Sequence, residues 1–181
     1  MSRELAPVTE WGLDPLYSSY RKMFVKHILS SVQVTEATGF FHLSLYSRPI
    51  SKVEVVGIIT HIEVQRARIT YKVDDGTGVI RCVKFISPDN ESVEGEAIRS
   101  SIIAAGTLVS AKGILTLSET NVDDFGLCVQ LSIFESIDEP NMEVFHWVTT
   151  MTLHNTCYSS IPPPQPLKQA YLPAPQYPKY S

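Results

Sequence analysis

Hydrophobic residues in the middle of the chain recur mostly at every second position, in runs separated by turn-forming residues. Five such runs are found, at residues 52–64, 67–73, 79–86, 107–117 and 127–134. Alternation rich in valine, isoleucine and threonine is typical of β-strands with one buried face. The sequence DDGTG at 74–78 predicts a tight turn between the second and third runs. We therefore predict five strands, of which the second and third form a hairpin.

Other segments have helical spacing or a different composition. We predict helices at residues 13–30, 88–105 and 140–154, and a short extended segment at 39–47. Asp14 is placed to cap the first helix, with Pro15 at its first helical position. Gly106 is placed to end the second helix. The predicted order is thus a helix, three strands, a helix, two strands and a last helix.

A helix between the third and fourth of five antiparallel strands is typical of the oligonucleotide/oligosaccharide-binding (OB) fold. Gly57 and Gly113 fall in mid-strand, where a small barrel has to coil sharply. The predicted fold class is mainly β, a five-stranded OB-fold barrel with an additional N-terminal helix and C-terminal helix. The predicted units are an N-terminal lead-in and helix at 1–38, an OB-fold domain at 39–138, a partner-binding helix at 139–158, and a proline-rich tail or linker at 159–181.

Composition agrees with one globular domain and extensions. The 181 residues are 44% hydrophobic and 19% charged, and no apolar run approaches the ~20 residues that span a bilayer. The N-terminus lacks the architecture of a signal peptide, so we expect it to be unprocessed. The three cysteines are scattered and odd in number, which favours reduced thiols in a cytosolic or nuclear protein. Seven prolines in 159–181 argue against packed structure there.

Positive charge is concentrated between residues 66 and 85. Five cations and two aspartates give this hairpin a net charge of +3, so the rest of the chain carries −7 of the total of −4. Alternation places Arg68 and Lys72 on one strand face, which we expect to be outward because burying an unpaired cation is costly. Arg81 carries Phe85 to the same side. The candidate nucleic-acid-binding residues are Arg66, Arg68, Lys72, Arg81 and Phe85.

A plainer interpretation of this face is also open. Phe85 would then cover a barrel end, and the cations would only solvate an exposed sheet. The fourth strand offers only Lys112 as a cation, and the loop at 118–126 is acidic. Any affinity of this domain alone for nucleic acid is therefore expected to be modest.

The last predicted helix is apolar around more of its circumference than one core-facing stripe needs. The candidate partner-binding residues are Val144, Phe145, Trp147, Val148 and Met151. Val144, Trp147, Val148 and Met151 form a seam for a partner helix, while Met142 and Phe145 are placed to brace the helix against its own barrel. The alternative is that the helix folds back and plugs the barrel.

No pattern in the chain predicts catalysis. There is no nucleophile elbow, pair of catalytic carboxylates or phosphate-binding glycine loop in the sequence. The Asp74-Asp75-Gly76 cluster matches a turn better than a calcium loop, and His61 with Cys82 would supply only two zinc ligands. We expect no enzyme activity, no catalytic residues, no metal and no cofactor.

Three stretches together carry a family resemblance: WGLDPLY at 11–17, RPISKVEVVGIITHIEV at 48–64, and ITYKVDDGTGVIRCVKF at 69–85. They resemble the Stn subunit of the CST telomere-capping complex, which is itself similar to the middle subunit of replication protein A. The resemblance covers about residues 11–155. VDDGTG alone is shared with other OB proteins of the replication protein A type.

The resemblance implies a nuclear, non-enzymatic OB subunit at telomeres that contributes to binding G-rich single-stranded DNA. It implies pairing with a small OB-fold Ten subunit, assembly with a large Ctc/Cdc-type subunit, and support of DNA polymerase α–primase in fill-in synthesis. Phe85 stands where relatives tend to carry an aromatic that faces DNA. The alternative is an assembly module like the replication protein A middle subunit, with little DNA contact of its own.

Overall fold

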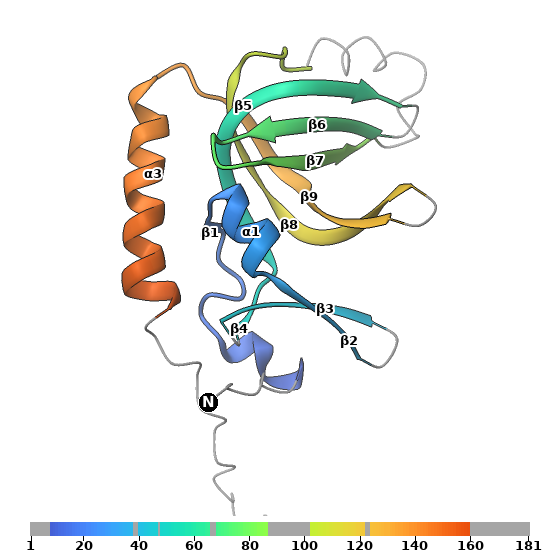
Figure 1. Ribbon diagram of the computed structural model, residues 1–181, viewed down its shortest axis with the longest axis vertical. Helices are drawn as coiled ribbons and strands as arrows, with labels where there is room; N and C mark the ends of the chain where they lie inside the picture. Colours follow the sequence, from blue (N-terminus) through green and yellow to red (C-terminus); the bar gives the residue numbers. More distant parts are fainter. Residues whose placement is uncertain are drawn as a thin grey trace, which may run out of the picture.

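The computed structural model describes residues 8–37, 40–46, 48–65, 68–86, 102–121 and 124–159. Its centre is a closed barrel (Figure 1) of the strands β5 (Lys52–Val64), β6 (Arg68–Asp74), β7 (Val79–Phe85), β8 (Leu108–Asn121) and β9 (Asp124–Ser136). The sheet order is β1-β5-β6-β7-β9-β8, and a further pairing of β5 with β8 closes it. β7 and β9 pair in parallel, while the other barrel pairs are antiparallel. The predicted five-stranded barrel is thus confirmed, with β8 and β9 longer than expected.

The core follows from the alternation in the sequence. Val53, Val55 and Ile59 of β5 point inward and are buried, as are Ile80 and Cys82 of β7. At the two mid-strand glycines, the backbone of the neighbouring strand lies too close to leave room for a side chain. A methyl group on Gly57 would collide with the carbonyl oxygen of Asp74, and one on Gly113 with that of Gln130.

The predicted helix at 13–30 is wrong over most of its length. A 3-10 helix occupies Val8–Leu13, a two-residue strand β1 occupies Arg21–Lys22, and only α1 (Val25–Ser31) is α-helical. The reason lies in tertiary contacts. The Asp14 carboxylate accepts hydrogen bonds from Arg48 at 2.5 and 2.7 Å, and Arg21 donates to the Pro49 carbonyl at 2.6 Å. These buried contacts hold 14–24 in a path that local helical spacing does not predict.

A second sheet lies beside the barrel (Figure 1). It contains β2 (Gln33–Ala37), β3 (Phe40–Leu45) and β4 (Arg48–Pro49) in antiparallel order. The extended segment predicted at 39–47 corresponds to β3, whereas β2 and β4 were not predicted. Leu43 and Leu45 join the main core, so this sheet packs on the barrel.

The predicted helix at 88–105 lies mainly outside the described residues. Its last four positions, 102–105, are described and are not helical. Gly106 adopts φ +86° in the turn that follows, before β8. The proline-rich segment lies outside the described part from residue 160 onward, and the predicted domain boundaries stay predictions.

The last helix is where the sequence places it. α3 (Asn141–Leu153) continues into a π-helical turn, His154–Tyr158. It runs along the outside of the barrel (Figure 1) and contacts β1 and β5. Among the described helices, none is long and apolar enough to cross a membrane.

Candidate nucleic-acid and partner interfaces

The outward surface of β6 and β7, which we call the β6–β7 face, brings four of the five candidate nucleic-acid-binding residues together. Arg68 lies opposite Phe85, and Lys72 lies opposite Arg81. Phe85 is 60% exposed, and the alternate residues of β6 (Ile69, Tyr71 and Val73) are buried in the core. The predicted division of the two strand faces is therefore confirmed. Arg66 lies outside the described residues.

Both arginines on this face have internal hydrogen-bond partners. Arg68 Nε donates to Gln65 Oε1 at 2.7 Å, and Gln65 in turn donates to Glu63 at 2.7 Å. Arg81 donates to the backbone carbonyl of Ser118 at 3.2 Å. A ligand phosphate would have to compete with these contacts or share the guanidinium groups.

Two cysteines, Cys82 of β7 and Cys128 of β9, are buried in the strands that form or adjoin this face. Cys128 lies beside Arg81 across the β7–β9 pairing. Burial raises the pKa of Cys128, although the charge of Arg81 and a hydrogen bond with Ser118 partly oppose this. Burial also raises the pKa of Cys82, which faces the core, away from the exposed His61. Within the described residues, no group of three or more potential ligands is placed to hold a metal ion.

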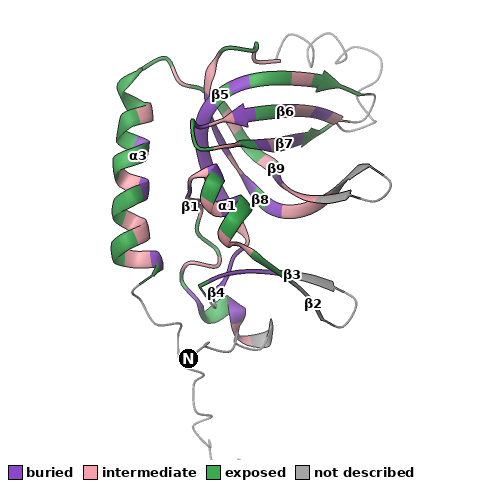
Figure 2. Cartoon of the chain, in the orientation of Figure 1, coloured by how far each residue is buried: buried purple, intermediate pink, exposed green. Residues whose placement is uncertain are grey.

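The second candidate interface is the outer side of α3 (Figure 2). Phe145 is 60% exposed and Val148 54%. Val144 and Met151 are similarly open to solvent. We call the side formed by Met142, Val144, Phe145, Trp147, Val148 and Met151 the outer face of α3.

The side of α3 that contacts the barrel is polar. His146 and Thr150 are almost completely buried, and their side-chain nitrogen and oxygen atoms have no hydrogen-bond partner there. His146 Nδ1 lies 3.9 Å from Glu54, whose carboxylate pairs with Lys22 at 2.5 Å. Burial lowers the pKa of His146 to about 4, and Lys22 acts in the same direction. The helix therefore attaches to the barrel through its polar side.

The expectation that Met142 and Phe145 brace α3 against the barrel is wrong, because both are exposed. Trp147 lies at the edge of the outer face: at 36% it is the least exposed of the six residues, and a methyl group on Gly76 would lie 3.8 Å from its Cζ2 atom. Leu153, near the end of the helix, is half-buried. Helical spacing alone could not distinguish these sides, since apolar residues surround most of α3. The end of the helix is anchored by His154, which stacks on His27 and bonds to Tyr46 at 2.9 Å.

Comparison with known proteins identifies the family to which the chain is similar. A family model described as telomere regulation protein Stn1 matches residues 10–160. The human CST complex subunit STN1 is 35% identical over 91 residues, which cover 50% of this chain and 24% of the human protein. The Arabidopsis thaliana subunit is 24% identical over 151 residues and is covered to 94% of its length. The chain thus spans about a quarter of the human relative and nearly all of the plant relative.

Solved structures show the same fold. A chain of the S. pombe Stn1–Ten1 complex aligns with a TM-score of 0.59 at 23% identity, covering 76% of this chain and 93% of that one. A chain of a replication protein A heterotrimer bound to single-stranded DNA aligns with a TM-score of 0.59 at 16% identity, covering 76% and 97%. The barrel and its trailing helix are therefore an OB fold of the kind found in Stn1 and replication protein A.

Proposed function

Because the chain belongs to the Stn1 family of telomere regulation proteins, we propose that it is a non-enzymatic OB-fold subunit of a telomere-capping complex. It binds a small OB-fold Ten-type subunit through the outer face of α3. It also contributes the β6–β7 face to binding of single-stranded G-rich telomeric DNA. It acts in the nucleus, at the telomere.

The observation that carries this proposal is the inverted orientation of α3. Its buried side presents His146 and Thr150, and its solvent side presents six large hydrophobic residues. A helix in a lone globular domain normally buries its apolar side. An apolar surface left open in this way is typical of an interaction site, and residues such as Phe145, Trp147 and Met151 are enriched in interfaces.

The outer face of α3 is wide enough for more than one partner. At 3.6 residues per turn, the apolar positions from Trp147 around to Met142 span an arc of about 220°, whereas one packed helix needs about 100°. One seam is formed by Val144, Trp147, Val148 and Met151, and Met142 with Phe145 forms a second. We assign the first seam to the Ten-type subunit and the second to the large Ctc/Cdc-type subunit.

The DNA contribution is supported by the chemistry of the β6–β7 face. Lys72 and Arg81 supply neighbouring positive charges, and the exposed ring of Phe85 is a platform on which a base can stack. Arg68 and Arg81 already make hydrogen bonds within the protein, so they contribute less to the free energy of DNA binding than unrestrained arginines would. This favours a modest affinity for DNA. The second candidate function is therefore a pure assembly module with little DNA contact of its own. Support of DNA polymerase α–primase would then be a property of the assembled complex.

The assembly test is co-purification of the full chain with a Ten-type subunit from the same organism. Val148→Asp places a charge in the first seam and should abolish the pair. Val64→Asp is the matched control, because Val64 is 53% exposed on the barrel, against 54% for Val148. If Val148→Asp and the unaltered chain form the pair equally well, the outer face of α3 does not bind the partner.

A further inference from the structure

Strand β5 contains a β-bulge that changes which way its side chains point. Its register with β6 shifts between Ile59, which lies opposite Val73, and His61, which lies opposite Lys72. Up to Ile59 the odd-numbered residues of β5 face the core, but after the bulge Ile62 packs against it. Thr60 and His61 are consequently both exposed, and Thr60 donates a hydrogen bond to the Lys72 carbonyl at 3.2 Å. Without the bulge His61 would point inward; bulges commonly re-aim a side chain in this way.

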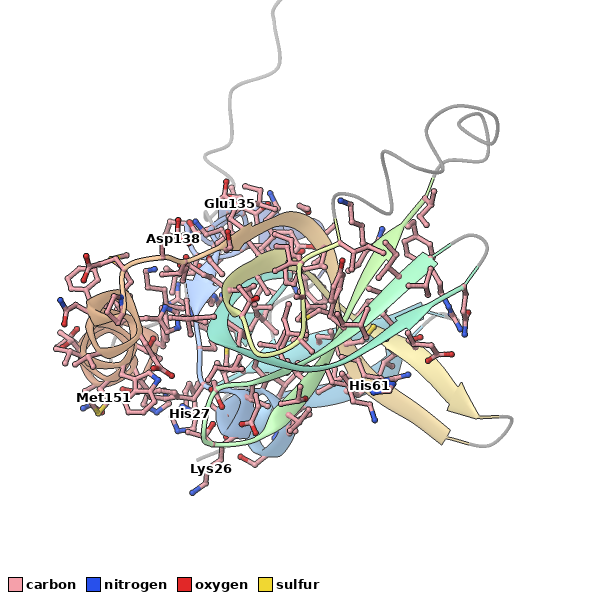
Figure 3. All side chains as sticks on the ribbon, turned by 90° about the horizontal axis from the view of Figure 1, so that it is seen from above. Lys26, His27, His61, Glu135, Asp138 and Met151 are labelled. Carbon is pink, nitrogen blue, oxygen red and sulfur yellow. The ribbon has the colours of Figure 1, made fainter. Side chains whose placement is uncertain are left out.

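The bulge extends the β6–β7 face by one strand. His61 lies opposite Lys72, and Lys72 lies opposite Arg81, so the three side chains form a row across three neighbouring strands. Strands in a sheet are roughly 5 Å apart, which makes the row about 10 Å long. Figure 3 shows His61 well separated from Met151, so this row and the outer face of α3 occupy different parts of the surface.

The charges that face His61 are mainly positive. Lys72 comes from β6 and Arg81 from β7, while Glu63 lies two residues further along β5 on the same side. No hydrogen bond or ion pair holds the His61 ring within the part of the chain that the structure describes. A phosphate bound over this row would be within reach of all three side chains, His61, Lys72 and Arg81.

We propose that His61 is a proton-dependent phosphate contact, which makes binding of single-stranded nucleic acid by this chain tighter as pH falls from about 8 to about 6. A histidine side chain ordinarily changes charge in this range. The inference rests on the proposed DNA function of the β6–β7 face. Binding would draw one proton onto His61 and add one cation to those supplied by Lys72 and Arg81.

The test measures the affinity of the full chain for a fluorescent oligo(dT) at about pH 6 and about pH 8, each over a range of salt concentrations. Thymine is used because it does not titrate in this range. For the unaltered chain we expect roughly threefold to tenfold tighter binding at the lower pH. The log–log salt slope should be steeper there by about 0.7, as one extra phosphate contact predicts for a single strand.

Two substitutions of His61 isolate its role. His61→Asn should bind at both pH values as the unaltered chain does at the higher one, and His61→Lys should bind tightly at both. Neither should unfold the protein, because His61 is exposed. Lys72→Ala is the reference for a pH-independent contact and should weaken binding equally at both pH values.

The outcomes distinguish failure of the role proposed for His61 from failure of the DNA function proposed for the β6–β7 face. If binding depends on Lys72 but is the same at both pH values, or if His61→Asn keeps the full pH dependence, the role of His61 is overturned and the DNA function stands. If the unaltered chain and its complex with a Ten-type subunit bind no oligonucleotide even at low salt, both are overturned.

Discussion

The carboxylate of Asp75 accepts a hydrogen bond from the backbone N–H of Val25 at 2.8 Å, and so caps a helix that begins 50 residues earlier in the chain. Its second oxygen accepts hydrogen bonds from the Thr77 backbone and hydroxyl at 2.9 and 2.7 Å, and from the Gly78 backbone at 3.2 Å. The Thr77 hydroxyl also accepts from the Lys26 N–H at 3.1 Å. The DDGTG turn thus joins the β6–β7 hairpin to α1.

Replacing Asp75 by alanine should therefore destabilise the fold. The change removes the cap of α1 and leaves several backbone donors without a partner in a buried place, at a cost of about 1–3 kcal/mol. The free energy of unfolding in urea measures it. Asp74→Ala is the matched control: Asp74 lies in the same turn, and its side chain accepts one hydrogen bond, from Gly76. Equal stabilities for the two variants would contradict the capping role.

Gly57→Ala should also be destabilising, for a different reason. The new methyl group would meet the Asp74 backbone, which cannot move without separating β5 from β6. We expect a loss of about 1–3 kcal/mol, as for other overpacked sites. Gly12→Ala serves as the control, because no atom lies within 4 Å of its added methyl group. A melting temperature that Gly57→Ala leaves unaltered would show that the strands have room to adjust.

The free energy of unfolding should decrease as pH falls from about 6.5 toward 4, because His146 is buried. Burial favours its neutral form and lowers its pKa from 6.5 to about 4, so the unfolded chain binds the proton more readily. The stabilisation is complete above about pH 6.5 and is lost as pH falls toward 4, by roughly 2 kcal/mol at pH 5. Burial, followed by the charge of His154, also lowers the pKa of His27, which acts in the same direction.

His146→Leu should reduce this pH dependence, measured as the free energy of urea unfolding at about pH 7.5 and about pH 5. It also removes two buried nitrogen atoms that have no hydrogen-bond partner, so we expect the variant to be more stable than the unaltered chain at the lower pH. Val144→Leu changes an exposed, non-titrating position of the same helix and should leave the pH dependence as it is. An unchanged slope in His146→Leu would mean that other groups govern the acid response.

Phe85→Ala should weaken binding of single-stranded DNA by about 1–3 kcal/mol through loss of base stacking. The ring is 60% exposed, so the fold should be unaffected. The measurement is made on the complex with the Ten-type subunit, and Ile133→Ala controls for loss of an exposed apolar side chain elsewhere on the barrel. Unchanged affinity in a folded Phe85→Ala variant would favour the view that Phe85 only covers the barrel end.

Sequence alone was sufficient where the information is local. Alternation in β6 and β7 determined that Arg68, Lys72, Arg81 and Phe85 share one side, because successive side chains in a strand point to opposite faces. Helical spacing located α3, and the strand pattern placed Gly57 and Gly113 in mid-strand. The sequence also identified the resemblance to the Stn subunit, because WGLDP and VDDGTG are short contiguous motifs.

Only the tertiary structure decided the rest, because those features depend on contacts between distant parts of the chain. The helix predicted from Asp14 onward does not form because the Asp14 carboxylate binds Arg48 instead. The direction of His61 depends on a bulge that appears only when β5 is paired with β6. The apolar circumference of α3 was visible in the sequence, but which part of it remains open was fixed by the polar surface of β1 and β5 against which His146 and Thr150 pack.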